Sequence, residues 1–159
     1  IAISYYYSYG IKVIITRAFA YLNPRREDIF SSSFAKRIVE VERGVISELI
    51  HGNLDSTRTL IDVRDIAEAY WLATQYCEYG EPYNVGGLTI ITVGEFLDML
   101  KSKAKKPISS RIDGSLLRPV DVTMQVPDIS KFTQRTRWKP KITIEDSVQF
   151  LLNYYREQT

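Results

Sequence analysis

Two arginines stand in surroundings that favour binding of an anion. Arg58 follows the polar segment His51–Thr57, and Arg118 lies in the loop Leu116–Val122, directly before a proline. A guanidinium can donate two parallel hydrogen bonds to phosphate oxygens, so arginines presented by loops are candidate phosphate ligands. From the pattern alone, each could equally be a solvated arginine or half of a structural ion pair.

Other reactive side chains favour structural interpretations. Arg25 and Arg26 share the ambiguity of Arg58, although neighbouring arginines point in different directions. His51 is the only histidine, so a histidine pair cannot ligate a metal, and we expect no metal site. Cys77 is the only cysteine and is expected on the buried face of a helix, where packing is its expected role. A chain without internal disulfides is expected in a reducing, cytoplasmic location.

The segment after Arg58 predicts a helix that begins at Asp62. The Asp62 carboxylate can accept a hydrogen bond from a free backbone N–H of the first turn. Gly80 is expected to end this helix in a left-handed conformation, and Pro82 to prevent its restart. An arginine beside a helix N-terminus favours an anion there. The positions expected on the buried face are Ile66, Ala69, Tyr70, Ala73, Tyr76 and Cys77.

Helix and strand patterns alternate along the rest of the chain. The β-branched run Ile11–Arg17 predicts a strand buried on both faces, and a helix over Ile1–Tyr9 precedes it, which favours a parallel sheet. A second helix is expected over Ser31–Arg43, with Ser31 to Ser33 as candidate N-caps and Gly44 as its end. Thr92 and Glu95 form a capping box. Further strands are expected at 83–85 and 108–112, and further helices at 130–136 and from Thr143 onward. The predicted fold class is therefore α/β.

Composition excludes several classes of protein. A length of 159 residues suits one domain, and a formal charge of +2 with no basic stripe argues against a nucleic-acid partner. No apolar run is long enough to span a membrane. No glycine-rich phosphate fingerprint follows a strand, and no Tyr-x-x-x-Lys pair occurs. Because Ile1 already lies inside a helical stretch, we expect the chain to be the C-terminal part of a longer protein.

Five segments together resemble a known superfamily. They are TRAFAYLNPRRED (16–28), HGNLDSTRTLIDVRDIAEAYW (51–71), YNVGG (83–87), LLRPVDV (116–122) and DISKFTQRTRWKPKITIEDSV (128–148). In this order they resemble the C-terminal half of an extended short-chain dehydrogenase/reductase, and within that superfamily the GDP-mannose 4,6-dehydratases.

The resemblance implies an architecture and an activity. Residues 1–20 would be the tail of the Rossmann NAD(P)-binding domain, its last helix and strand. Residues 21–159 would be mostly the smaller mixed α/β nucleotide-sugar-binding domain with interleaved Rossmann elements. The whole enzyme would be a lyase of deoxysugar (GDP-fucose) biosynthesis that converts GDP-mannose to GDP-4-keto-6-deoxymannose with NADP or NAD. It would be a cytoplasmic homodimer or homotetramer without a membrane partner.

The resemblance also assigns residues. Arg58 and Arg118 match arginines that grip the nucleotide diphosphate, and Arg26 matches an arginine that reaches the cofactor, which a neighbouring subunit can hold. The catalytic Tyr-x-x-x-Lys pair has no counterpart here, so this chain alone is expected to be inactive.

The sequence departs from the family pattern at two places. Ala20-Tyr21 stands where the family usually has Asn-His, which removes a polar substrate contact and leaves Tyr21 at a cofactor-binding position. Arg137 stands where Gly often precedes Trp-x-Pro, which predicts a different helix ending. The alternatives are a GDP-4-keto-6-deoxyhexose reductase, a UDP-sugar epimerase and, in another class, a non-catalytic nucleotide-sugar-binding module.

Overall fold

Helices and short strands alternate in an α/β fold, as predicted. The computed structural model describes residues 1–117 and 119–158. Its α-helices are α1 (Ala2–Tyr9), α2 (Phe30–Arg43), α3 (Val63–Tyr76), α4 (Val93–Ser102), α5 (Ser130–Thr136) and α6 (Ile144–Glu157). Its strands are β1 (Ile15–Ala18), β2 (Tyr21–Leu22), β3 (Leu49–His51), β4 (Thr57–Asp62), β5 (Pro82–Val85), β6 (Thr89–Thr92), β7 (Ser110–Ile112) and β8 (Met124–Gln125), and η1 (Gly114–Leu116) is a 3-10 turn.

β4 is the strand around which the others are arranged. It runs antiparallel to β6 along one edge and parallel to β2 and β8 along the other. Two further parallel pairs join β1 to β5 and β3 to β7. Four of the five pairings between described strands are therefore parallel, which confirms the expected parallel pairing.

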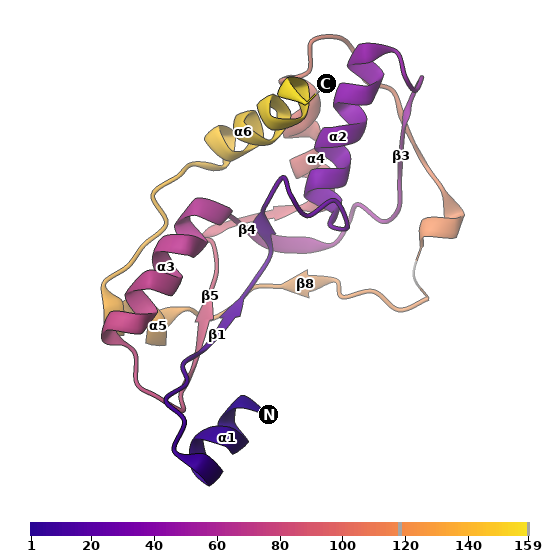
Figure 1. The fold of residues 1–159 in the computed structure, drawn as a ribbon. Helices are drawn as coiled ribbons and strands as arrows, with labels where there is room; N and C mark the ends of the chain where they lie inside the picture. Colours follow the sequence, from indigo (N-terminus) through magenta and orange to yellow (C-terminus); the bar gives the residue numbers. More distant parts are fainter. Residues whose placement is uncertain (118, 159) are drawn as a thin grey trace.

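Apolar side chains form two cores, and β4 contributes to both. Leu60 belongs to the core between α2, α4 and α6, whereas Ile61 belongs to the core between β1, β5, α3 and α5. Successive side chains of a strand point to opposite faces, which explains this division. Figure 1 shows the two groups of helices with β4 between them.

The backbone of β4 also restricts which residue type can stand at position 87, just after β5. A Cβ at Gly87 would lie 1.9 Å from the Leu60 carbonyl oxygen, so only glycine fits this approach. The strand expected at 83–85, followed by two glycines, is thus confirmed. The close approach to β4 explains why the second of them, Gly87, is a glycine.

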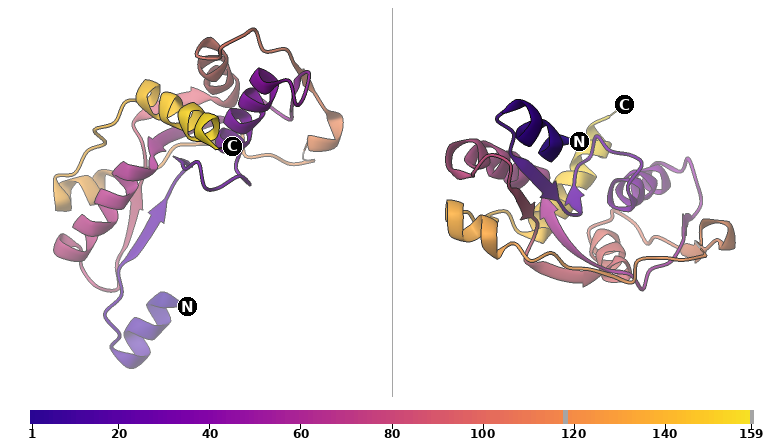
Figure 2. Two further views of the ribbon diagram at one scale, coloured as in Figure 1. Left: turned by 45° about the horizontal axis from the view of Figure 1, so that its top comes forward. Right: turned by 90° about the horizontal axis from the view of Figure 1, so that it is seen from below.

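α1 lies apart from both cores. None of its residues is buried, and Figures 1 and 2 show it at one end of the molecule. α1 contacts the rest of the molecule where its Tyr6 ring packs on Gly80, and a Cβ added at Gly80 would lie 2.5 Å from that ring. The Gly80 N–H donates to the Val13 carbonyl at 2.7 Å, which holds this turn against the segment before β1. Among residues 1–117 and 119–158, no helix has both the length and the apolar character needed to cross a bilayer.

Several predicted helix ends are confirmed. Asp62 Oδ1 accepts from the Arg64 N–H at 2.9 Å, and Thr143 Oγ1 accepts from the Asp146 N–H at 3.1 Å. Thr92 and Glu95 make both hydrogen bonds of the capping box. Gly10 and Gly44 end α1 and α2 with φ of 65° and 76°. Polar caps are local, so the sequence predicts them well.

The expected strand over Ile11–Arg17 is wrong in its extent and its burial. β1 begins only at Ile15, Ile11 is 45% exposed and Arg17 is exposed. The β-branched run has strand propensity, but its first residues form no pair with β5, whose register with β1 begins at Ile15.

The serine N-caps expected for one helix and the glycine end expected for another are wrong. α2 begins at Phe30 without a side-chain cap, and Ser31 and Ser32 are buried inside it. α3 ends at Tyr76, so Gly80 (φ 81°) shapes the following turn rather than the helix end. Two tyrosines expected on the buried face of α3, Tyr70 and Tyr76, are 41% and 52% exposed.

The expectation of a different ending for α5 is wrong as well. Arg137 adopts φ 60°, and its N–H donates to the Thr133 carbonyl at 2.8 Å. The helix therefore ends in the left-handed conformation that glycine would adopt, and arginine tolerates it at an energetic cost.

Candidate functional site

A cleft of about 470 Å³ brings together three of the four binding residues expected from the sequence. One wall comes from the segment between β1 and α2, a second from β4 and the loop before it, and a third from the connection between β7 and β8. Tyr21, Arg26 and Arg58 all line it. Among the further lining residues are Phe19, Asp28, Asn53, Ser56, Asp121 and Gln125.

Arg58 is held at the cleft by its strand. In β4 it lies opposite Ile91 of β6 on one edge and Gln125 of β8 on the other. Its Nη1 donates to the Thr57 carbonyl at 2.8 Å, and the residue is half-buried. None of the ion pairs found among residues 1–117 and 119–158 involves Arg58. No described carboxylate therefore lies at ion-pair distance from its guanidinium.

Arg26 is already paired with a carboxylate. Its Nε and Nη2 donate to Asp28 Oδ1 and Oδ2 at 3.2 and 2.6 Å. Its Nη1 reaches the Tyr21 hydroxyl at 3.4 Å, and the guanidinium carbon lies 5.9 Å from the centre of the Tyr21 ring. The hydrogen bonds from Arg26 lower the pKa of Asp28, so the pair stays charged at neutral pH. Tyr21 therefore contacts Arg26 itself.

A polar network joins the loop before β4 to the connection between β7 and β8. Asp121 Oδ2 accepts from Ser56 Oγ at 3.0 Å and from Asn53 Nδ2 at 3.2 Å. The Ser56 hydroxyl, the Asn53 amide and the charge of Arg58 lower the pKa of Asp121. These three residues were not assigned individually from the sequence. The only available signal was their position in the segments 51–58 and 116–122, because the contact joins residues 65 positions apart.

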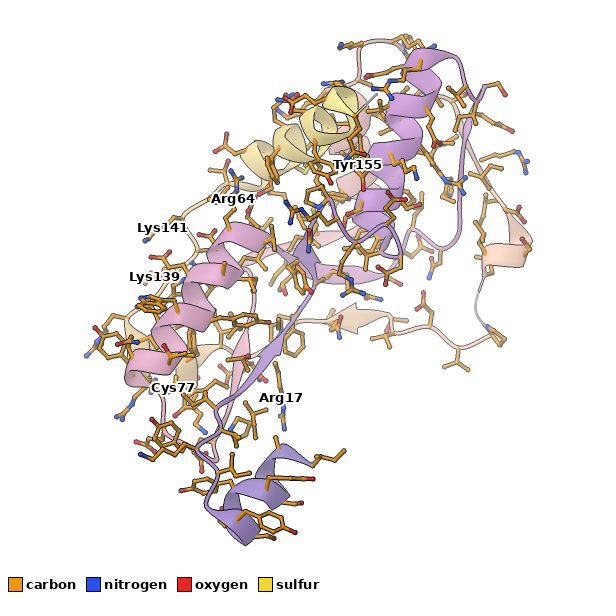
Figure 3. The ribbon with its side chains drawn as sticks, viewed as in Figure 1. Arg17, Arg64, Cys77, Lys139, Lys141 and Tyr155 are labelled. Atoms are coloured by element: carbon orange, nitrogen blue, oxygen red, sulfur yellow. The ribbon has the colours of Figure 1, made fainter. Side chains whose placement is uncertain are left out.

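The N-terminus of α3 is not part of this cleft, contrary to expectation. Arg58 lies four residues before Asp62, about 13 Å along a strand. The Asp62 carboxylate occupies the helix end and pairs with Arg64 at 2.8 Å. Arg64 lies between α3 and α6, 4.3 Å from the centre of the Phe150 ring (Figure 3). Among the described residues, the positive charges that line the cleft are those of Arg26 and Arg58.

Of the other candidate residues, His51 and Cys77 do not line this cleft. Arg118 falls outside the described residues, so its role stays a prediction. His51 Nδ1 lies 2.8 Å from the Gly52 carbonyl oxygen. Cys77 follows the last turn of α3 (Figure 3), and burial raises the pKa of its thiol, which disfavours the nucleophilic thiolate. Within the described part of the chain, no group of three or more His, Cys, Asp or Glu residues is arranged to hold a metal ion.

Comparison with known proteins decides the family. A family model described as GDP-mannose 4,6 dehydratase matches residues 1–151. The chain belongs to this family. It is 26% identical over 146 residues to GDP-6-deoxy-D-mannose reductase from Pseudomonas aeruginosa, covering 91% of this chain and 48% of that one. It is 28% identical over 156 residues to GDP-mannose 4,6 dehydratase 1 from Arabidopsis thaliana, covering 95% and 42%.

The fold is shared with solved structures of the superfamily. The structure of RMD from Pseudomonas aeruginosa complexed with NADPH superposes with a TM-score of 0.90 at 23% identity, covering 99% of this chain and 53% of that one. The expected likeness to the C-terminal part of an extended short-chain dehydrogenase/reductase is confirmed. The chain spans less than half the length of the two sequence relatives named above.

Proposed function

We propose that this chain forms the nucleotide-sugar-binding part of an NAD(P)-dependent dehydratase that converts GDP-mannose to GDP-4-keto-6-deoxymannose. The observation that carries the proposal is the single cleft lined by Arg26 and Arg58, two arginines 32 positions apart in the sequence. Membership of the GDP-mannose 4,6 dehydratase family supports the choice of a GDP-sugar.

The cleft suits a diphosphate better than a neutral ligand. Arg58 contributes a half-buried guanidinium that forms no ion pair with residues 1–117 and 119–158 and can donate two hydrogen bonds to phosphate oxygens. Asn53, Ser56 and Asp121 add neighbouring polar atoms that can hydrogen-bond hydroxyl groups. The function proposed for these residues is to hold the nucleotide and so orient the sugar, a contribution of position rather than of proton transfer.

A nicotinamide cofactor completes the proposal. The chemistry that a bound NADP or NAD would supply is reversible hydride transfer with the sugar. Arg26 and Tyr21 are the residues of this chain proposed to contact it, because an arginine beside an aromatic ring suits a phosphate next to a nucleotide base. Arg26 would have to share its donors between Asp28 and that phosphate.

The two cores bear on the proposed division into domains. Residues 1–20 would be the tail of the cofactor-binding domain, and residues 21–159 mostly the sugar-binding domain. The core shared by β1, β5, α3 and α5 supports interleaving, because β5, α3 and α5 lie after residue 20 but pack with β1. A homodimer or homotetramer in the cytoplasm belongs to the same proposal and is supported by the family resemblance alone.

A related reductase is the second candidate. Ala20 and Tyr21 line the cleft where the resemblance predicts Asn and His, so the sugar meets a different surface. A reductase of a GDP-4-keto-6-deoxyhexose would use the same diphosphate contacts. One sequence relative at 26% identity is named as a GDP-6-deoxy-D-mannose reductase.

The test is titration of the purified chain with GDP and with UDP by calorimetry. We expect GDP to bind more tightly, and Arg58→Ala to weaken it about tenfold or more, since a lost charge-assisted pair is worth about 1.5–3 kcal/mol. Arg118→Ala is expected to act in the same direction. The matched control is Arg111→Ala, which removes an arginine on β7 whose side chain is paired with Glu48.

Other outcomes point elsewhere. Unchanged GDP affinity in both Arg58→Ala and Arg118→Ala contradicts the proposal. A preference for UDP favours the epimerase. If the natural full-length polypeptide binds GDP-mannose in the presence of NADP without converting it, the non-catalytic binding module is favoured.

A further inference from the structure

The backbone that carries Arg26 forms a tight turn with an internal lock. The Arg26 N–H donates to the Asn23 carbonyl at 3.1 Å, which closes a four-residue turn over 23–26. Pro24 occupies the second position, where its fixed φ suits such a turn. The Arg25 N–H donates to Asn23 Oδ1 at 3.0 Å. The turn therefore has few ways to rearrange internally.

Two side-chain hydroxyls from distant helices fix this turn from outside. Ser32 Oγ, on α2, donates to the Asn23 carbonyl at 2.6 Å. The Tyr155 hydroxyl, on α6, donates to the Pro24 carbonyl at 2.5 Å, across 131 positions of sequence. Ser32 is 0% and Tyr155 4% exposed, and Pro24 is buried as well. Figure 3 shows Tyr155 between α6 and α2.

The helix that supplies Tyr155 is itself held in place. Arg43 Nη2 donates to the Tyr155 carbonyl at 3.2 Å and to the Arg156 carbonyl at 3.0 Å. Arg156 donates to both carboxylate oxygens of Glu42 on α2, at 2.9 and 2.6 Å, in a pair whose side chains are 15% and 6% exposed. The position of the Tyr155 hydroxyl is thus set by the packing of α6 on α2.

We infer that Tyr155 and Ser32 are positioning residues that hold the 23–26 turn so that Arg26 is presented to a ligand phosphate in the cleft. Neither residue lines the cleft, whereas Arg26 does. Removing the Tyr155 hydroxyl leaves the buried Pro24 carbonyl without that donor, and removing the Ser32 hydroxyl leaves the Asn23 carbonyl with only the Arg26 N–H, so in both cases the turn loses an anchor to a helix. A displacement of about 1 Å is enough to impair a positioned group. The inference rests on the proposed function, because it needs Arg26 to bind a phosphate.

The test compares Tyr155→Phe and Ser32→Ala with Arg26→Ala and with the corresponding double variants. GDP and NADP are the two probes, and titration of Arg26→Ala identifies which of them Arg26 contacts. For that probe we expect Tyr155→Phe to weaken binding about threefold to tenfold, the range of one hydrogen bond. In the Arg26→Ala background the same substitution is expected to have no further effect, because the group it positions is absent.

Two controls separate positioning from general loosening of the fold. Tyr83→Phe removes another buried tyrosine hydroxyl, which accepts from the Glu78 N–H in the other core. It is expected to leave affinity unchanged. Arg25→Ala removes the neighbouring arginine of the same turn, which is exposed and does not line the cleft, and is also expected to have no effect.

The outcomes distinguish this inference from the function on which it rests. Wild-type chain that binds neither probe contradicts the proposed function, and Arg26→Ala that weakens neither contradicts the expected role of Arg26; the inference fails with either. Arg26→Ala that weakens a probe while Tyr155→Phe and Ser32→Ala do not overturns the inference alone. Equal weakening by Tyr155→Phe in the wild-type and Arg26→Ala backgrounds also overturns it.

Discussion

At the scale of single residues, the charges of the cleft are distributed unequally. Arg26 donates to both oxygens of Asp28, whereas Arg58 donates to a backbone carbonyl. An anion that approached Arg26 would therefore compete with Asp28, whereas Arg58 forms no ion pair with the residues that the structure describes. Arg58 is the residue whose removal should cost most affinity.

The expected binding residues illustrate what a sequence can predict of a site. Side-chain chemistry and the loop before it single out Arg58, the family resemblance adds Arg26, and the fold places both in one cleft. The pairing of Arg26 with Asp28, and of Ser56 with Asp121, could not be predicted. Such contacts depend on rotamers and on the course of the chain, which residue types do not specify.

Arg137 gives a prediction about a single residue. Its φ of 60° costs about 1–2 kcal/mol for a residue with a Cβ, and glycine avoids most of that cost. Arg137→Gly is therefore expected to raise the free energy of unfolding by about 1 kcal/mol, partly offset by the greater entropy of glycine in the unfolded chain. Urea denaturation of the wild type and of Arg137→Gly measures this difference in the free energy of unfolding.

The matched control is Arg137→Ala, which removes the same charge but keeps the Cβ. It is expected to change the free energy of unfolding by less than about 0.5 kcal/mol. An equal gain in both variants would assign the effect to the side chain and contradict the explanation by backbone strain.

At the scale of elements, helices were easier to predict than strands. Asp62, Thr92 and Thr143 each cap a helix through hydrogen bonds within three residues, so the signal is local. β2 and β8 contain two residues each and exist only because β4 pairs with them. No periodicity can reveal a strand of two residues.

The burial of Tyr155 where α6 meets the 23–26 turn makes stability depend on pH. Burial, and then the negative charge of Glu27, raise the pKa of Tyr155 from 10.0 to about 12. Because the folded chain has the higher pKa, the stabilisation is complete below pH 10 and is lost as the pH rises through 12. In that window we expect the wild-type free energy of unfolding to fall by about 1.4 kcal/mol per pH unit from this group.

Tyr155→Phe isolates that contribution. The variant cannot ionise at this position, so its free energy of unfolding should fall less steeply with pH than that of the wild type. Urea titrations of both proteins between about pH 9 and pH 11.5, within the range where tyrosine titrates, give the two slopes. Equal slopes would contradict the assignment.

At the scale of the whole molecule, β4 joins the two cores and carries Arg58 at its start. Leu60 packs in one core and Ile61 in the other. The position of β4, and with it that of Arg58, therefore depends on the packing of both cores. The sequence predicted an α/β fold with parallel pairing, but not that one strand would serve two cores. That arrangement follows from long-range contacts.

The measurement that tests the central claim most directly is the location of GDP on the chain. Isotope-labelled protein of 18.4 kDa is suitable for amide chemical-shift mapping during a GDP titration. The proposed cleft predicts saturable shifts in the segments 19–28, 52–58 and 121–125, and none in α5. Shifts centred elsewhere, or no shifts with GDP at millimolar concentration, would contradict the assignment of the cleft as the nucleotide-sugar site.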